Sequence, residues 1–118
     1  MREAGVLMPV SALPSSVGAG ELGEAAFHFI ELLKKNHVKI WQILPLNPVG
    51  YGNSPYQPYS SCAGDDIYIS LDTLAEEGLL KKSPMPFLEK CKKVDYERVR
   101  QYREPYLRAA FMAFVEQK

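Results

Sequence analysis

Residues 38–46 read Val-Lys-Ile-Trp-Gln-Ile-Leu-Pro-Leu, a stretch rich in the β-branched and aromatic side chains that favour strands. A second apolar run covers residues 4–10. It contains Pro9, and it is long enough for a buried strand but too short for a helix. Two mostly apolar strands with a helix between them are typical of a βαβ unit and a parallel sheet. The sequence therefore predicts an α/β fold.

The segment between these strands has the spacing of an amphipathic helix that begins at Glu21. Apolar residues recur at helical intervals: Leu22, Ala26, Phe29 and Leu33. Glu21 and Glu24 fall in the first turn and the two lysines at 34 and 35 in the last, which suits the helix dipole. Asn36 is expected to end the helix.

Shorter elements are expected after the central loop. The alternation of apolar and polar residues over 66–71 predicts a short strand. Asp72 is expected to cap a helix that runs to about Glu77. Asp95 is expected to cap a further helix, which Pro105 either kinks or divides in two.

Composition excludes several classes of protein. The chain has 118 residues, of which 47% are apolar and 24% charged, as in an ordinary globular domain. No stretch approaches the roughly 20 apolar residues that cross a bilayer, and the amino terminus does not resemble a signal peptide. Cys62 and Cys91 are the only cysteines and form no CxxC pair. We therefore expect neither a disulfide framework nor a zinc site. These features together predict a cytoplasmic protein without a membrane partner.

Charge is distributed unevenly along the chain. Residues 1–80 hold 4 basic and 9 acidic side chains, whereas residues 81–118 hold 10 basic and 5 acidic ones, a balance of −5 followed by +5. A nucleic-acid-binding module could use such a basic tail. Because its basic residues alternate with acids and apolar anchors, the pattern favours a solvated helical surface, and no nucleic-acid partner is expected.

The segment from Pro45 to Ser61 is long, irregular and rich in glycine and proline. It follows the second strand, and loops at the carboxyl ends of parallel strands carry the binding sites of α/β folds. Aromatic faces can stack on the C–H faces of a pyranose, and neutral hydroxyls and amides suit its hydroxyl groups. No cluster of lysines or arginines accompanies them, so phosphate is not indicated. Tyrosines and prolines also pack loops for structural reasons, so composition alone indicates only a candidate site for a neutral, polyhydroxylated ligand.

A series of motifs resembles the amino-terminal region of the 4-α-glucanotransferases, the amylomaltase or disproportionating-enzyme family. The most specific ones are Trp-Gln-Ile-Leu-Pro-Leu at 41–46 and Gly-Tyr-Gly-Asn-Ser-Pro-Tyr-Gln at 50–57. The others are Gly-Val-Leu-Met-Pro at 5–9, Leu-Pro-Ser at 13–15, Gly-Ala-Gly at 18–20, Ala-Gly at 63–64, Ile-Ser-Leu at 69–71 and Glu-Gly-Leu-Leu at 77–80. The chain departs from the family pattern at Ala12, Ala19 and Asp65-Asp66, outside the 51–57 run.

The resemblance implies the amino-terminal part of a (β/α)8 barrel: a first βαβ unit plus inserted helices. It implies a transferase that moves α-1,4-glucan segments between maltooligosaccharides by a retaining mechanism. Tyr56 and Ser54 resemble residues that contact sugar near the scissile bond, and Tyr51 resembles an aromatic residue that stacks on glucan at a more peripheral site. Gln57 and Asn53 are expected to shape the loop, with Gln57 included among the substrate-binding residues. Trp41 and Gln42 are expected to support the core.

No catalytic residue, metal ligand or cofactor is predicted within the chain. In the resembled family the catalytic carboxylates come from later barrel strands. The acids of this chain are expected in structural or solvated positions: Glu21 and Glu24 at a helix start, Asp72 at a cap, and the pair Asp65-Asp66 in a solvated turn. His28 and His37 have no partner serine, cysteine or metal-ligand companion.

One βαβ unit cannot close a barrel, and two parallel strands alone would expose apolar faces and edges. We therefore expect residues 1–118 to be an amino-terminal fragment of the catalytic barrel, with an inserted helical region from about 72 to 118. Its partners would be α-1,4-glucans, maltooligosaccharides and the remainder of the same barrel. The alternative hypothesis is a non-catalytic carbohydrate-binding or scaffold fragment.

Overall fold

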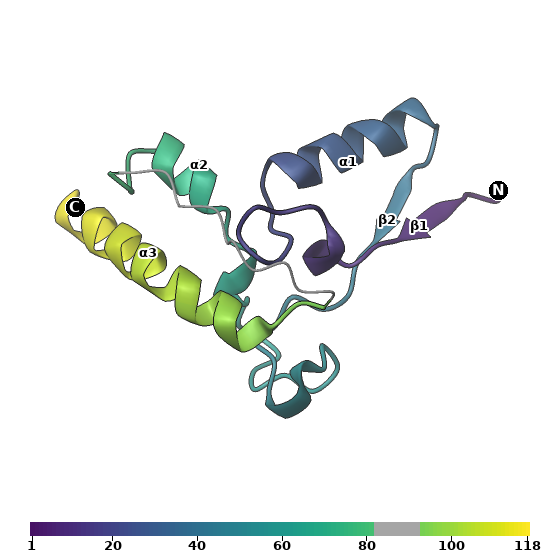
Figure 1. Ribbon diagram of the computed structural model, residues 1–118. Helices are drawn as coiled ribbons and strands as arrows, with labels where there is room; N and C mark the ends of the chain where they lie inside the picture. The colour runs from purple at the N-terminus through teal and green to yellow at the C-terminus, as the bar shows by residue number, and fades with distance from the viewer. Residues whose placement is uncertain (82–92) are drawn as a thin grey trace.

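Two parallel strands joined by a helix form the amino-terminal unit of the chain (Figure 1). The structure is a computed structural model that describes residues 1–81 and 93–118. β1 (Gly5–Leu7) pairs in parallel with β2 (Ile40–Gln42), with Val6 opposite Trp41. α1 (Glu24–Lys35) connects them. The predicted α/β organisation is confirmed, although both strands are shorter than the apolar runs that predicted them.

Trp41 attaches α1 to the strand pair. Its ring meets that of Phe29 edge to face, with centroids 5.0 Å apart, and its Nε1 donates to the Met8 carbonyl oxygen at 2.9 Å. An aromatic pair of this geometry contributes beyond the area it buries. Trp41 therefore supports the core, as its position on the strand predicted.

α1 begins at Glu24 rather than at Glu21, so the predicted start is wrong by three residues. Gly23 occupies the amino-terminal cap, and Leu22 instead forms an isolated parallel bridge with Ile69. The predicted end is confirmed, since Asn36 is the carboxyl-terminal cap and its Nδ2 donates to the Leu32 carbonyl oxygen at 2.8 Å. The helical spacing of apolar residues continues through residues 21–23, but the bridge of Leu22 with Ile69 keeps these residues out of the helix.

Gly20 stands in the first loop, which lies between β1 and α1. Its amide donates to the Ser11 carbonyl oxygen at 3.1 Å. A β-carbon at this position would lie 2.0 Å from the carbonyl oxygen of Val10, in the short 3-10 turn η1 (Val10–Ala12). The glycine therefore permits a close approach of two backbone segments that no other residue allows.

The strand predicted over 66–71 is wrong. The segment forms a 3-10 turn, η3 (Asp66–Tyr68), followed by the single bridge at Ile69. The reason is local, because the Asp65 carboxylate accepts a hydrogen bond from the Ile67 amide at 3.1 Å and so favours a helical turn. Asp72 is not the cap of α2 (Leu71–Glu76); that role belongs to Ser70, whose hydroxyl accepts from the Thr73 amide at 3.2 Å.

α3 (Tyr96–Glu116) is one continuous helix that Asp95 caps as predicted. Pro105 lies inside it and neither starts a second helix nor ends the first. The turns before Pro105 are fixed by ion pairs of Arg100 with Asp65 and of Arg103 with Glu21. The interpretation of this region as a solvated surface is therefore wrong for these two arginines, because they join the basic end of the chain to its acidic part.

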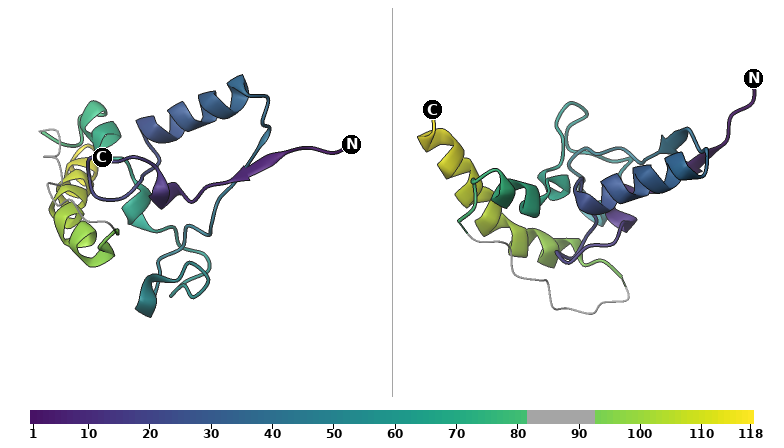
Figure 2. Two further views of the ribbon diagram at one scale, coloured as in Figure 1. Left: turned by 45° about the vertical axis from the view of Figure 1, so that its right-hand side comes forward. Right: turned by 90° about the horizontal axis from the view of Figure 1, so that it is seen from above.

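The core gathers on the first loop, which packs against α1 and Trp41 of β2 in one cluster and against Val99 of α3 in another. One buried cluster contains Val10, Leu13 and Ala26, and a second contains Ala19, Ile67 and Val99. Tyr68 packs against both. Figure 2 shows the strand pair and α3 at opposite ends of an elongated body measuring 50 × 33 × 32 Å.

Large apolar side chains remain exposed on the amino-terminal unit. They belong to β1, α1 and β2: Leu7, Phe27, Ile30, Leu32 and Ile40. This is the exposure expected when two parallel strands lack their neighbours. Within residues 1–81 and 93–118, no helix combines the length and apolar character needed to cross a membrane. The region 82–92, which includes Cys91, lies outside the described residues.

Candidate functional site

The loop that follows β2 is held together by its own backbone contacts (Figure 1, teal). Val49 and Pro58 form an isolated antiparallel bridge. The Gly50 amide donates to the Gln57 carbonyl oxygen at 3.2 Å, and the Tyr59 amide donates to the Pro48 carbonyl oxygen at 2.9 Å. The two arms of the loop therefore run side by side and present their tip away from the body.

The tip is a 3-10 turn, η2 (Tyr51–Asn53), followed by a turn around Ser54. Gly52 and Asn53 have positive φ angles of 81° and 54°, a conformation that glycine and asparagine tolerate best. The Gln57 amide donates to the Ser54 carbonyl oxygen at 3.1 Å, and the Tyr56 amide approaches the Ser54 hydroxyl oxygen at 3.4 Å. Residues 54–57 thus share one turn.

The expected sugar-binding residues are consequently neighbours. Tyr56 is 71% exposed, Gln57 is exposed and Ser54 is half-buried. The side chain of Tyr51 lies outside the part of the chain that the structure describes, so its position in the site stays a prediction. An exposed ring beside a hydroxyl and an amide has the chemistry for stacking on a sugar and binding its hydroxyl groups.

A cavity of about 250 Å³ lies at the carboxyl ends of the two strands. Residues that follow both strands line it, together with the 45–61 loop and the start of α3; they include Pro9, Leu44, Leu46, Asn53, Pro55, Asp65, Tyr68, Tyr96 and Arg100. Asn53 and Pro55 flank Ser54, whereas Ser54, Tyr56 and Gln57 are not among the lining residues. Ser54, Tyr56 and Gln57 therefore stand beside the cavity rather than inside it.

Asp65 is buried on one side of this cavity, which contradicts its interpretation as part of a solvated turn. Its two carboxylate oxygens accept hydrogen bonds from Nη1 and Nη2 of Arg100 at 2.8 and 2.6 Å. Asp66 is exposed, as expected. The pair spans 35 positions in the sequence, so no local pattern indicated it.

Burial by itself would raise the pKa of Asp65, but the hydrogen bonds from Arg100 and the Ile67 amide, with the charge of Arg100, hold it below the usual 3.8. The same pairing raises the pKa of Arg100. A carboxyl group whose pKa is lower in the folded state stabilises that state above its unfolded pKa, and this contribution is lost as the pH falls through the folded value.

Asp65→Asn is therefore expected to destabilise the protein most at neutral pH. As the pH falls below about 3.8, the unfolding temperatures of wild type and variant should converge, because Asp65 itself becomes protonated. Calorimetric unfolding across this pH range measures the difference. A gap that stays constant throughout the acid range would contradict the assignment.

The other described acids have structural or exposed positions. Glu21 accepts a hydrogen bond from Arg103 at 2.8 Å, so its expected place in the first turn of the helix is wrong. Glu24 does occupy that turn and lies 3.8 Å from exposed His28. Within residues 1–81 and 93–118, no group of three histidine, cysteine or acidic residues could hold a metal ion. The assignment of no catalytic residue to this chain stays a prediction.

Sequence and structure comparisons give a consistent result. A family model described as 4-alpha-glucanotransferase matches residues 8–118. A 4-alpha-glucanotransferase of Streptococcus pneumoniae serotype 4 is 41% identical over 118 residues, which cover 98% of this chain and 23% of that protein. One from Synechocystis is 44% identical over 117 residues, covering 96% of this chain and 23% of that protein.

A solved structure is similar over the same range. Amylomaltase from Streptococcus agalactiae in complex with acarbose superimposes with a TM-score of 0.91 at 36% identity. The match covers 98% of this chain and 24% of that one. The chain thus spans about a quarter of the length of the relatives that it matches.

Proposed function

The chain belongs to the 4-alpha-glucanotransferase family, and from this membership we propose that it is the amino-terminal, sugar-contacting part of a glucan-transferring enzyme. The complete enzyme would transfer α-1,4-glucan segments between maltooligosaccharides. The observation that carries the proposal is the ordered loop after β2, which presents Tyr56 and Gln57 to solvent beside Ser54. These are groups that can bind a neutral sugar.

The two strands are proposed to be the first strands of a (β/α)8 barrel, with residues from about 72 to 118 forming a helical insertion. The exposed apolar side chains on β1, α1 and β2 support this, because further strands and helices of the barrel would cover them. The binding loop would then lie at the carboxyl face of the barrel, where the active sites of this fold are found. The exposed free thiol of Cys62 is consistent with a reducing, cytoplasmic compartment.

The chemical step would be a retaining double displacement. It requires a carboxylate nucleophile and a carboxylic acid about 5–5.5 Å apart. Glu21 and Asp65 are both engaged by buried or half-buried arginines, so neither is available to attack a sugar. In the proposed division of roles this chain holds the glucan, and later strands of the barrel supply the acids that break its bond.

Incubation of the complete protein with maltotriose is expected to yield glucose together with longer maltooligosaccharides. Chromatography of the products distinguishes the possible outcomes. Glucose and maltose without longer products would indicate a hydrolase. Binding of maltooligosaccharides without any turnover would favour the non-catalytic alternative and contradict the proposal.

A further inference from the structure

We propose that Asp65 and Arg100 are positioning residues of the glucan site, and that they act by fixing the base of the 45–61 loop. The inference rests on the proposed function and extends it to two residues that do not belong to the loop. Arg100 comes from α3, so the proposal also gives the helical region a role in substrate binding.

The geometry of the Asp65–Arg100 pair fixes the orientation of the two side chains relative to each other. Both carboxylate oxygens and both terminal nitrogens take part, at 2.8 and 2.6 Å, and the Asp65 side chain is 3% exposed. Such a bidentate contact fixes the angle between the guanidinium and carboxylate planes as well as the distance between the two groups. The Asp65 carboxylate also accepts from the Ile67 amide. Its position is therefore determined by several contacts at once.

Asp65 is joined directly to the start of the loop. Its amide donates to the Leu46 carbonyl oxygen at 2.7 Å. One residue further along, Asn47 Nδ2 donates to the Ala63 carbonyl oxygen at 2.8 Å. These two hydrogen bonds close the base of the loop, bringing its entry at 46–47 beside its exit at 63–65. Whatever holds Asp65 in place therefore holds the loop base in place.

The cavity places the same groups beside the binding residues. Asp65 and Arg100 line it together with Leu46, Asn53 and Pro55, so its wall runs from the loop base to the positions flanking Ser54. Removal of the Arg100 guanidinium would leave the buried Asp65 carboxylate without its cation. The residues that line the cavity from the loop base to Asn53 and Pro55 would then move. Because the proposed loop contacts bind sugar rather than act on the reacting bond, the main effect is expected on KM.

The second arginine pair provides a matched control. Arg103 also joins α3 to earlier parts of the chain, through Glu21 of the first loop and the Ile69 carbonyl group after η3. Neither Glu21 nor Arg103 lines the cavity at the carboxyl ends of the strands. A general loosening of α3 would affect both pairs alike, whereas positioning of the loop requires only the Asp65–Arg100 pair.

The test uses the complete protein and initial rates of maltotriose disproportionation. Arg100→Gln is expected to raise KM about tenfold with kcat changed by less than about twofold. Arg100→Lys keeps the positive charge but cannot donate two parallel hydrogen bonds to the carboxylate, so its KM should lie between those of wild type and Arg100→Gln. Asp65→Asn/Arg100→Gln should cost less than the sum of its single substitutions. Glu21→Gln should lower the unfolding temperature and leave KM unchanged.

An unchanged KM in Arg100→Gln would overturn the positioning role, and so would an equal rise in KM in Glu21→Gln. If Arg100→Gln does not fold, Arg100→Lys provides the same comparison with wild type. Wild-type protein that transfers no glucan would instead overturn the proposed function, so the two failures are distinguishable.

Discussion

Arg103→Met is expected to lower the free energy of opening of α3 by about 3–5 kcal/mol, the usual cost of removing one partner of a buried ion pair. Arg103 is 1% exposed and its partner Glu21 is 9% exposed. Methionine fills much of the same space but leaves the Glu21 carboxylate buried without a cation. It also removes the hydrogen bond to the Ile69 carbonyl oxygen.

Hydrogen exchange of the α3 amides in the complete protein measures this effect locally. Where the helix recloses faster than its open amides exchange, protection reports the equilibrium for opening, and about 4 kcal/mol corresponds to a roughly thousandfold fall. Glu21→Gln/Arg103→Met should recover much of the loss, because the double variant buries no unpaired charge.

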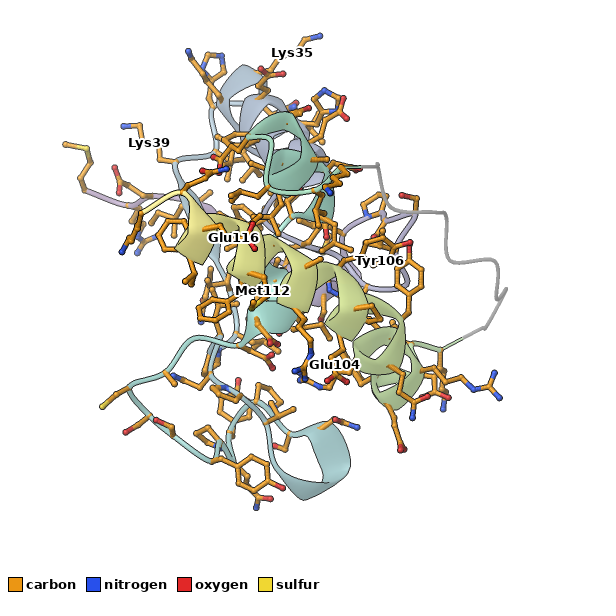
Figure 3. All side chains as sticks on the ribbon, turned by 90° about the vertical axis from the view of Figure 1, so that its left-hand side faces the viewer. Lys35, Lys39, Glu104, Tyr106, Met112 and Glu116 are labelled. Atoms are coloured by element: carbon orange, nitrogen blue, oxygen red, sulfur yellow. The ribbon has the colours of Figure 1, made fainter. Side chains whose placement is uncertain are left out.

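The control is an exposed ion pair on the same helix. Glu104, labelled in Figure 3, accepts a hydrogen bond from Arg108 at 2.9 Å, and both side chains are largely exposed. Exposed pairs at this spacing contribute only about 0.3–0.5 kcal/mol. Arg108→Gln should therefore leave α3 protection nearly unchanged. Equal losses in Arg103→Met and Arg108→Gln would contradict the structural role assigned to Arg103.

The sequence predicted the strands and helix caps, because these depend on residues that are close together in the chain. Apolar runs indicated the two strands, and side-chain chemistry indicated the caps at Asn36 and Asp95. The parallel pairing followed from the helix between the strands.

Long-range ion pairs account for the main errors. Helical periodicity reaches Glu21 and predicts it in the helix, yet its carboxylate binds an arginine 82 positions away. Asp65 and Asp66 look alike in sequence, but only Asp65 is buried beside Arg100. An acidic first part and a basic last part were visible in the composition. This charge asymmetry indicated that the two parts of the chain could attract each other, but it did not identify which acid pairs with which arginine.

Tyr56→Ala is expected to reduce kcat/KM for maltotriose about thirtyfold, corresponding to roughly 2 kcal/mol for a central aromatic contact. Tyr56 is 71% exposed in a turn fixed by Ser54, so its ring is free to stack on a sugar and its removal leaves no cavity in the core. Tyr59 is a matched control, since it is a tyrosine of the same loop and is 81% exposed.

The central claim is that this chain holds glucan through the loop after β2. The most direct test compares kcat/KM for maltotriose disproportionation in the complete wild-type protein, in Tyr56→Ala and in Tyr59→Ala. The account predicts a loss of about thirtyfold for Tyr56→Ala and less than about threefold for Tyr59→Ala. Wild-type kcat/KM in Tyr56→Ala would contradict it, whereas equal losses in the two variants would contradict the particular role assigned to Tyr56 within the loop.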